Sequence, residues 1–473
     1  MPYKMQGKIL LPSILALAVG SFLVAGCASG MLSTNSTNSN STSPTGASFV
    51  VGTDAPMASV TSFAVQLSAV TAYNASDCSG TGVSLVSGAP TVDFARFNGL
   101  QTLIDMNDVA PGTYNCVSIT LGTATLGYLN TSSGGAPTIT SEAATLPSTP
   151  FTYPLANPMV VATAGAPVGL HMDFDLRKSI EVDSNGNITG AVNPTFNVKA
   201  VNNSDPGAYI DEFDAAVLGT DASTQTFTIQ GPHGRKFTVN VTGQTEWDGS
   251  ASLSTLTSSS IVQVSGFLDR ADATIDADEV ALLTDTGFYA GGQVTYVAPP
   301  TGTATSFDLY VRGTLPASTG VADGDIATVN LSGSEKFSIY WMHGPLAQFL
   351  FNPSGLLAGQ HVAVGGPASG AASASAVTVT HVMLRDWGFN GTVVPGSENS
   401  GNNSFQLQVT GFAGLLIPEK VTVYVAGNTS FRDGFSGFSD LMDGANVRVV
   451  GLLLKDPTSG NAVLIGHYVD ELD

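Results

Sequence analysis

The sequence predicts an all-β protein in which an N-terminal antiparallel β-sandwich precedes three small five-stranded β-barrels of OB-like topology. Charged residues make up only 11% of the 473 residues, and glycine, serine, threonine and valine, which are poor helix formers, are abundant. Apolar and polar residues alternate with a period of two in many short segments, as half-buried strands require. A pattern of five short strands recurs three times after residue 204, which indicates a repeated small domain.

Residues 1–26 predict an export signal. Lys4 and Lys8 give a basic start, residues 9–24 are mostly apolar, and small residues follow them. A transmembrane helix needs about 20 predominantly apolar residues, and the flank here is polar rather than basic. We therefore expect this segment to be removed from the mature protein.

The signal ends in LVAGC, residues 23–27, which resembles the lipobox of bacterial lipoproteins. The resemblance implies that Cys27 is acylated, with palmitate or similar chains, and anchors the protein in membrane lipid. Such chains hold a protein stably, since each buried methylene contributes about 0.8 kcal/mol. The alternative is an ordinary signal peptide with an incidental cysteine. Ala28, where some bacteria use aspartate as an inner-membrane retention mark, favours the outer membrane or the cell surface of the bacterial envelope.

The composition after the signal predicts a tether and then an acidic body. Residues 27–47 are nearly all small or polar, so they cannot bury enough apolar surface to fold, and we expect a disordered Ser/Thr/Asn tether. The chain has 16 Lys and Arg against 37 Asp and Glu, a net charge of −21. Nucleic acid is therefore excluded as a partner, because binding to phosphates needs basic patches.

The β-sandwich is predicted over residues 48–202. Segments 60–73 and 112–126 alternate with a period of two, and Asn185-Gly186 is a hairpin signal. The motifs TDAP, LIDM, VAPGTYNCVSITL, MDFDLRKSIEV and GNITGAVNPTFNV, in this order, resemble the bacterial domain-of-unknown-function family four-three-eight-two. The resemblance implies a carbohydrate-binding-like sandwich in a lipoprotein, with no established catalytic residues.

Cys78 and Cys116 are the only cysteines of the mature body. An exported chain meets an oxidising compartment, so we predict a disulfide between them if their strands lie close together. The alternative is a pair of unpaired buried thiols, because spacing in the sequence does not prove proximity.

The three barrels are predicted over residues 203–286, 287–386 and 387–473. Their first strands begin with FDAAVLG, FYAGGQVTYV and WGFNGTVV, so Trp387 takes the place of Phe213 and Phe288 and is expected in the core. Five strands in each unit favour a closed barrel, because closure removes exposed edges. The strand motif GxxVxVxG in residues 205–473 resembles a second bacterial family, domain of unknown function five-six-six-six.

Motifs of catalysis are missing from the sequence. No GxSxG, GxxxxGK[ST] or HExxH pattern occurs, and the six histidines are scattered over all four domains. We therefore predict a protein that is not an enzyme and that has no cofactor and no metal site.

Two residue pairs are candidates for ligand contact. Asp173 and Asp175 alternate on a predicted strand, so their carboxylates face the same side and could share a cation or a proton. A solvated outer face is the interpretation that we favour for them. Tyr340 and Trp341 are adjacent on another strand, so one ring faces outward and could contact a sugar.

These observations together predict a membrane-anchored envelope lipoprotein that acts as a non-catalytic binding or scaffold module. Its expected partners are membrane lipid, through acylated Cys27, and a glycan or an envelope protein. The alternatives are a purely structural surface spacer and, in third place, a hydrolase. An enzyme would be favoured if the fold placed distant acids such as Asp173 and Asp175 in a cleft with a third group.

Overall fold

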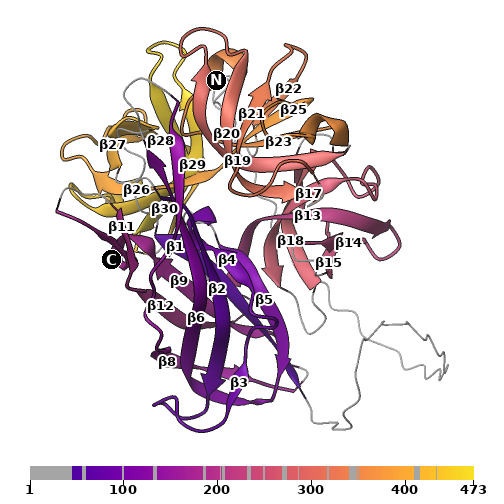
Figure 1. Cartoon of the computed structure of the whole chain (residues 1–473), viewed down its shortest axis with the longest axis vertical. Coiled ribbons are helices and arrows are strands. Elements are labelled where there is room, and N and C mark those ends of the chain that lie inside the picture. The colour runs from indigo at the N-terminus through magenta and orange to yellow at the C-terminus, as the bar shows by residue number, and fades with distance from the viewer. Residues whose placement is uncertain are drawn as a thin grey trace, which may run out of the picture. The chain divides into compact units, whose positions relative to one another are not determined.

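A computed structural model describes residues 45–472, and strands make up most of them (Figure 1). Within this range the description omits 56–59, 98–100, 131–135, 164, 185–187, 203, 205–207, 232–235, 249–250, 269–273, 286, 317–318, 340–348, 350, 410–415 and 433. Cys27, Tyr340 and Trp341 therefore lie outside the described residues. No helix in the described part of the chain is both long and apolar enough to cross a bilayer.

The N-terminal part contains two main sheets. The first has the order β12-β9-β1-β5, from Phe196–Asn202, Val168–Asp175, Gly46–Ala55 and Thr102–Val109. The second has the order β3-β2-β6-β7, from Gly82–Ser84, Val60–Tyr73, Gly112–Asn130 and Thr138–Ala143; β4 (Thr91–Asp93) pairs with β2, and β8 (Phe151–Val161) pairs with β6. A short helix α1 (Leu176–Ser179) and a hairpin of β10 (Ile180–Val182) and β11 (Ile188–Val192) follow β9.

The prediction of a wholly antiparallel sandwich was wrong at one strand pair. Strands β1 and β9 run parallel over residues 48–55 and 168–175, whereas every other pair in the two sheets is antiparallel. Parallel neighbours need a long crossover connection, and here the chain forms the entire second sheet between β1 and β9. Period-two alternation is the same in both strand directions, so it does not distinguish them.

The sandwich core follows from that alternation. Every second residue of β2 is buried along most of the strand, and Phe63 is completely buried. Its ring lies 5.1 Å from that of Phe174 on β9, which in turn lies 4.5 Å from Phe196 on β12. Aromatic contacts of this kind contribute beyond the area that they bury, and they join the two sheets.

The C-terminal barrel closes in the order β26-β27-β28-β30-β29. These strands are Trp387–Val393, Ser404–Val409, Lys420–Arg432, Ala462–Glu471 and Asn446–Lys455. In order along the chain they form the ring 1-2-3-5-4, in which strands three and five run parallel. This arrangement confirms the OB-like barrel predicted from the repeats.

The first barrel has the same ring. Its strands in chain order are β13 (Tyr209–Asp221), β14 (Thr226–Gln230), β15 (Lys236–Asn240), β17 (Ile261–Leu268) and β18 (Thr274–Thr284). The parallel pairing of β15 with β18 closes it, and β16 (Glu246–Asp248) extends β18 further.

In the second barrel, the strand that corresponds to β18 is divided in two. Its strands are β19 (Phe288–Ala298), β20 (Ser306–Leu315), β21 (Ile326–Asn330), β22 (Lys336–Ile339), β23 (His361–Gly366), β24 (Val377–Thr378) and β25 (His381–Arg385). Strand β24 pairs with β21 in parallel, and β25 pairs with β22 and β23. The same connectivity therefore occurs three times.

Strand register corrects one detail of the repeat alignment. Phe288 and Trp387 both lie opposite a glycine of the fourth strand, Gly366 and Gly451, so their predicted equivalence is right. In the first barrel Ile210 lies opposite the corresponding Gly266, whereas Phe213 lies opposite Val264, two residues away on the same strand. Trp387 is buried, with 2% of its surface exposed.

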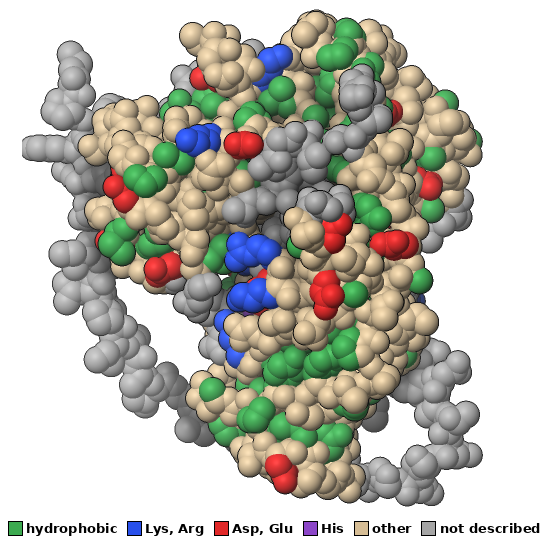
Figure 2. All heavy atoms as spheres, turned by 60° about the vertical axis from the view of Figure 1, so that its left-hand side comes forward, with side chains coloured by type: hydrophobic (Ala, Val, Ile, Leu, Met, Phe, Trp, Pro, Cys, Tyr) green, Lys and Arg blue, Asp and Glu red, His purple; other side chains and the backbone are tan. Residues whose placement is uncertain are grey.

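The described residues belong to one compact unit, Pro44–Asp473, because neighbouring domains share their cores. Phe49 and Leu103 of the sandwich pack in one apolar cluster with Ile210 of the first barrel. Leu452 and Ile465 of the third barrel pack in the core of the second. Between the charged groups, uncharged polar side chains and backbone dominate the face drawn in Figure 2, as the low charge content requires.

Candidate functional site

A β-bulge in β13 shapes the candidate site. The register between β13 and β17 shifts between Ile210 and Phe213, so two residues of β13 lack regular ladder partners. One of them, Glu212, has a φ of 48°, in the left-handed region that non-glycine residues rarely adopt. Its N–H donates to the hydroxyl of Ser265 at 3.0 Å in place of a ladder bond. Bulges redirect side chains, and this one turns a glutamate into the protein interior.

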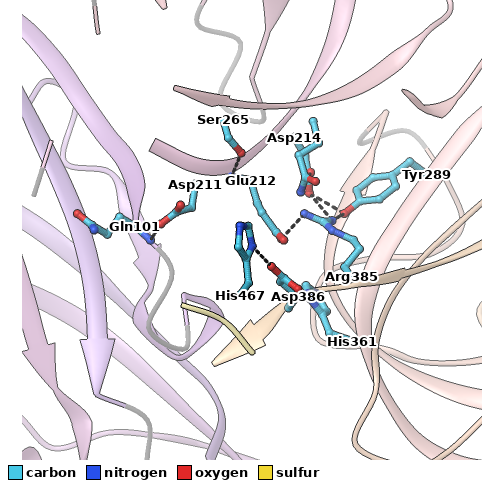
Figure 3. A network of polar contacts seen from close by, with 11 residues as sticks. Gln101, Asp211, Glu212, Asp214, Ser265, Tyr289, His361, Arg385, Asp386 and His467 are labelled. Carbon is cyan, nitrogen blue, oxygen red and sulfur yellow. Dashed lines mark hydrogen bonds and ion pairs between the residues drawn. The ribbon is translucent and has the colours of Figure 1, made fainter. Parts of the chain in front are cut away.

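The glutamate meets an arginine from the second barrel. Nη2 of Arg385 lies 2.7 Å from Oε2 of Glu212, and Nη1 lies 3.2 Å from Oδ2 of Asp214 (Figure 3). The three side chains are 3%, 8% and 5% exposed. The hydroxyl of Tyr289 donates to the same Asp214 oxygen at 2.6 Å and accepts from Arg385 Nη1. Two barrels are thus joined by a buried ion-pair network.

Burial and charge act in opposite directions on these groups. Burial raises the pKa of Glu212 well above its ordinary value, although the Arg385 guanidinium opposes this shift. Burial alone would lower the pKa of Arg385, but Asp214 and Glu212 raise it well above its ordinary value. Arg385 is therefore a permanent cation in this site.

Asp211 connects the first barrel to the sandwich. Its N–H donates to the carbonyl of Gln101 at 2.8 Å, and its Oδ2 accepts from the N–H of Gln101 at 3.1 Å. Burial raises the pKa of Asp211 to about 6, against the attraction of Arg432. Its carboxyl group therefore titrates at a higher pH than an exposed aspartate.

A histidine–aspartate contact joins the second and third barrels beside this network. Nδ1 of His467 lies 2.6 Å from Oδ2 of Asp386 (Figure 3). Nδ1 of His361 donates to the backbone carbonyl of Asp386 at 2.9 Å, and the His361 ring lies 4.6 Å from that of Trp387. Polar contacts therefore link all three barrels around one region.

A cavity of about 420 Å³ lies between the sandwich and the first two barrels. This is within the range of about 300 to 1,000 Å³ that small-ligand sites occupy. Its apolar lining includes Phe97, Leu103, Ile104, Phe213 and Tyr310. Its charged lining consists of Asp93, Asp211, Glu212, Asp214, Asp323, Arg312 and Arg385, and Tyr289 and His361 lie beside them.

Two buried atoms of the Glu212–Arg385 ion pair, whose residues both line the cavity, have no hydrogen-bond partner among the described residues. They are Oε1 of Glu212, an acceptor, and Nε of Arg385, a donor. Buried polar groups are nearly always satisfied, so an unsatisfied acceptor and donor in two ion-paired residues indicate a missing partner. A group that both donates and accepts would complete them.

Comparison with family models covers two parts of the chain. Residues 48–189 match a domain of unknown function, DUF4382. Residues 218–281, in the first barrel, match a second domain of unknown function, DUF5666. Both resemblances and their order along the chain are as predicted. A search of curated proteins returned no match. Asp211, Glu212, Asp214 and Arg385 lie outside both matched ranges.

The sites predicted within the DUF4382 region have separate roles. Asp175 caps α1: its Oδ1 accepts from the N–H of Lys178 at 3.0 Å, and its Oδ2 lies 3.0 Å from Lys178 Nζ. Asp173 is half-buried, its Oδ1 has no hydrogen-bond partner, and burial raises its pKa. The expectation of a solvated face was therefore wrong for Asp173, because β9 is a central strand of its sheet. Neither aspartate lines the cavity.

The two cysteines of the DUF4382 region form a disulfide, Cys78–Cys116, with Cα atoms 5.2 Å apart. Cys116 lies on the central strand β6, and Cys78 lies in the turn that follows β2. The bond thus fixes this turn to the second sheet. Neither cysteine lines the cavity.

Sequence reasoning missed Glu212, Asp214 and Arg385. A signal was present in YIDEFD, residues 209–214, where three acids in four positions interrupt an otherwise apolar strand. A second signal was Arg385, which follows the apolar residues VML in a chain with only 16 Lys and Arg. Charged side chains in buried strands need partners of opposite charge. The acids of residues 209–214 and Arg385 could therefore have been predicted to lie close together. Among the described residues, no group of three or more His, Cys, Asp or Glu side chains is arranged to hold a metal.

Proposed function

We propose that the protein is a lipid-anchored component of the bacterial envelope that binds a hydroxyl-rich small molecule of the glycan class in this cavity. The observation that carries the proposal is the pair of unsatisfied atoms, Glu212 Oε1 and Arg385 Nε, in two residues that line the cavity. A hydroxyl group can donate to the carboxylate and accept from the guanidinium, which a purely apolar ligand cannot do. The anchor at Cys27 is part of the same proposal and rests on the lipobox.

The rest of the lining suits a sugar. Sugar rings combine apolar faces with hydroxyl edges, and binding sites for such ligands combine aromatic surfaces with a few polar groups. Here Phe97, Phe213 and Tyr310 supply the rings. The site uses both the DUF4382 region and the barrels, so the barrels contribute to binding and are more than spacers in this proposal.

A hydrolase is the second candidate, because Asp211, Glu212 and Asp214 do meet in a cavity with a third group, Arg385. The contacts favour binding over catalysis. Hydrolysis of a glycosidic bond uses two carboxyl groups that flank the bond, one as acid and one as base or nucleophile. Glu212 and Asp214 instead bind the same guanidinium, which holds both of them as its counter-ions.

A glycan-array screen of the whole mature chain, with Cys27 replaced by alanine to keep it in solution, tests the proposal. Ala64 lines the cavity on β2, and Ala64→Phe would fill part of it. Ser68→Phe is the matched control, because Ser68 is exposed on the same strand and does not line the cavity. We expect a specific hit that Ala64→Phe weakens and Ser68→Phe retains.

Three other results have defined meanings. The absence of any hit, or a hit that Ala64→Phe leaves unchanged, would contradict a binding site in the cavity. Release of shorter sugars from a bound glycan would favour the hydrolase. A chain that folds normally without binding any glycan would favour the structural spacer.

A further inference from the structure

The charges that line the cavity are unbalanced. Five acidic side chains and two arginines contribute to the lining. Net negative charge in a cavity with surroundings of low dielectric repels anions and attracts cations more strongly than the same charge does in water. The imbalance therefore restricts the kind of ligand that can enter.

Both arginines are already engaged by protein groups. Arg385 pairs with Glu212 and Asp214. Nη1 of Arg312 donates to the carbonyl of Ala95 at 2.7 Å, and its guanidinium carbon lies 4.6 Å from the centre of the Trp387 ring. An anionic ligand would therefore have to compete with protein groups for either arginine.

Two of the carboxylates accept hydrogen bonds from backbone N–H groups. Oδ1 of Asp93 accepts from the N–H of Phe63 at 2.8 Å, and Asp211 accepts from the N–H of Gln101. An N–H donor satisfies a carboxylate oxygen but leaves its negative charge in place.

We infer that the ligand carries an ammonium group beside its hydroxyls, as an amino sugar does, and that Glu212 is the counter-ion of this ammonium. The inference deepens the proposed function and rests on it. Glu212 is the acid best placed for this role, because its side chain is 8% exposed, lines the cavity and has an oxygen without a hydrogen-bond partner. An ammonium has three donors and forms strong charge-assisted hydrogen bonds with carboxylates.

Asp214 cannot take the same role as readily. Its Oδ2 already accepts from Tyr289 and pairs with Arg385, and its Oδ1 accepts from the amide of Gln263 at 3.4 Å. Glu212 and Asp214 differ in their backbone as well as in their partners. Glu212 lies in the bulge and has a left-handed conformation that a regular strand does not contain. Strained backbone of this kind is concentrated at ligand-binding sites.

The test compares two disaccharides that differ only in charge, β-1,4-linked glucosamine dimer and its di-N-acetylated form, by titration calorimetry on the whole soluble chain. 1,4-Diaminobutane is a third probe that carries ammonium groups without hydroxyls. We expect the free amine to bind about tenfold or more tightly than the acetylated dimer, because hydrogen bonds between charged groups are stronger than those between neutral groups. If only the diamine binds, the cavity recognises an ammonium group, but its ligand is a polyamine and not an amino sugar.

Glu212→Gln separates the contribution of the ligand's ammonium group to the binding affinity from the contribution of its hydroxyl groups. Glutamine retains an acceptor oxygen for Arg385 and for a hydroxyl but lacks the charge. We expect this variant to lose the preference for the amine over the acetylated dimer. Glu419→Gln, at an exposed position of the third barrel, is the matched control and should keep that preference.

The outcomes distinguish this inference from the proposed function. If the acetylated dimer binds as tightly as the free amine or more tightly, the cavity does not recognise an ammonium group. The proposed binding of a hydroxyl-rich ligand would then still stand. An unchanged preference in folded Glu212→Gln would overturn the role of Glu212. If no probe binds, both the inference and the proposed function fail. If Glu212→Gln does not fold, the comparison of the two dimers on the unmodified chain still decides whether the ammonium is recognised.

Discussion

The guanidinium of Arg385 in the second barrel lies 2.7 Å from the carboxylate of Glu212 in the first, across 173 residues of sequence. Both side chains are more than nine-tenths buried. Both groups of a buried ion pair have lost their hydration, so removal of one partner leaves the charge of the other uncompensated. The contact therefore adds a charge-dependent link to the apolar packing of the first two barrels.

Arg385→Met is expected to destabilise the protein strongly. It leaves Glu212 and Asp214 buried without their cation, and such losses typically cost about 3 to 5 kcal/mol. Chemical unfolding, followed by tryptophan fluorescence, measures the change. Arg177→Met, at an exposed position, is the matched control and should be nearly neutral. A loss of less than about 1 kcal/mol for Arg385→Met would mean that solvent enters the site and screens the pair.

The disulfide is expected to add to stability through the unfolded chain. Cys78 and Cys116 are separated by 38 residues, and closure of a loop of this length is worth roughly 3 to 4 kcal/mol in the chain-entropy account. The double variant Cys78→Ser/Cys116→Ser should therefore unfold at lower denaturant concentration, and reduction of the unmodified protein should have the same effect. Peptide mapping without reductant should find the two segments linked. Free thiols in freshly exported protein would contradict this expectation.

Cys27→Ala is expected to release the protein from membranes. The acyl chains implied by the lipobox are the anchor in our proposal, and alanine cannot carry them. Fractionation of cells that express the variant should find the protein in the soluble fraction, whereas the unmodified protein sediments with membranes. Cys78→Ser serves as a control for loss of a cysteine elsewhere. Membrane attachment of Cys27→Ala would rule out the lipid anchor.

Local pattern was sufficient to predict the strands and the barrels. Alternation in residues 60–73 and 112–126 corresponds to β2 and β6, because a half-buried strand forces a period of two. The repeated five-strand pattern predicted the OB-like ring, because three copies of one pattern fold in one way. The parallel pairing of β1 with β9 was not predictable, because strand direction leaves no trace in the alternation.

The cavity could not be predicted from the same pattern. Its lining joins residues as distant in the sequence as Asp93, Glu212, Arg312 and Arg385, and only the packing of domains brings them together. The bulge at Glu212 depends on a register shift, which alternation does not encode. What the sequence did contain was the anomaly itself, a cluster of acids and one arginine in apolar strands, without the contact that explains it.

Asp211→Asn is expected to change how stability depends on pH. Burial raises the pKa of Asp211 from 3.8 to about 6, so the folded protein holds this proton more tightly than the unfolded chain does. The contribution of this residue to the free energy of unfolding is therefore highest below about pH 4 and falls as pH rises through about 6. Asparagine does not titrate and can still accept from the N–H of Gln101, so it should remove that fall.

The difference in the free energy of unfolding between Asp211→Asn and the unmodified protein should consequently be small at pH 4. It should grow to roughly 1 to 3 kcal/mol in favour of Asp211→Asn at pH 7. Denaturant unfolding at a series of pH values measures it. Asp221→Asn, at an exposed position of the same strand whose pKa is lowered by hydrogen bonds from Ser223, is the control and should not become more stable with rising pH. A pH-independent difference for Asp211→Asn would show that Arg432 outweighs burial and keeps the carboxylate ionised in the folded protein.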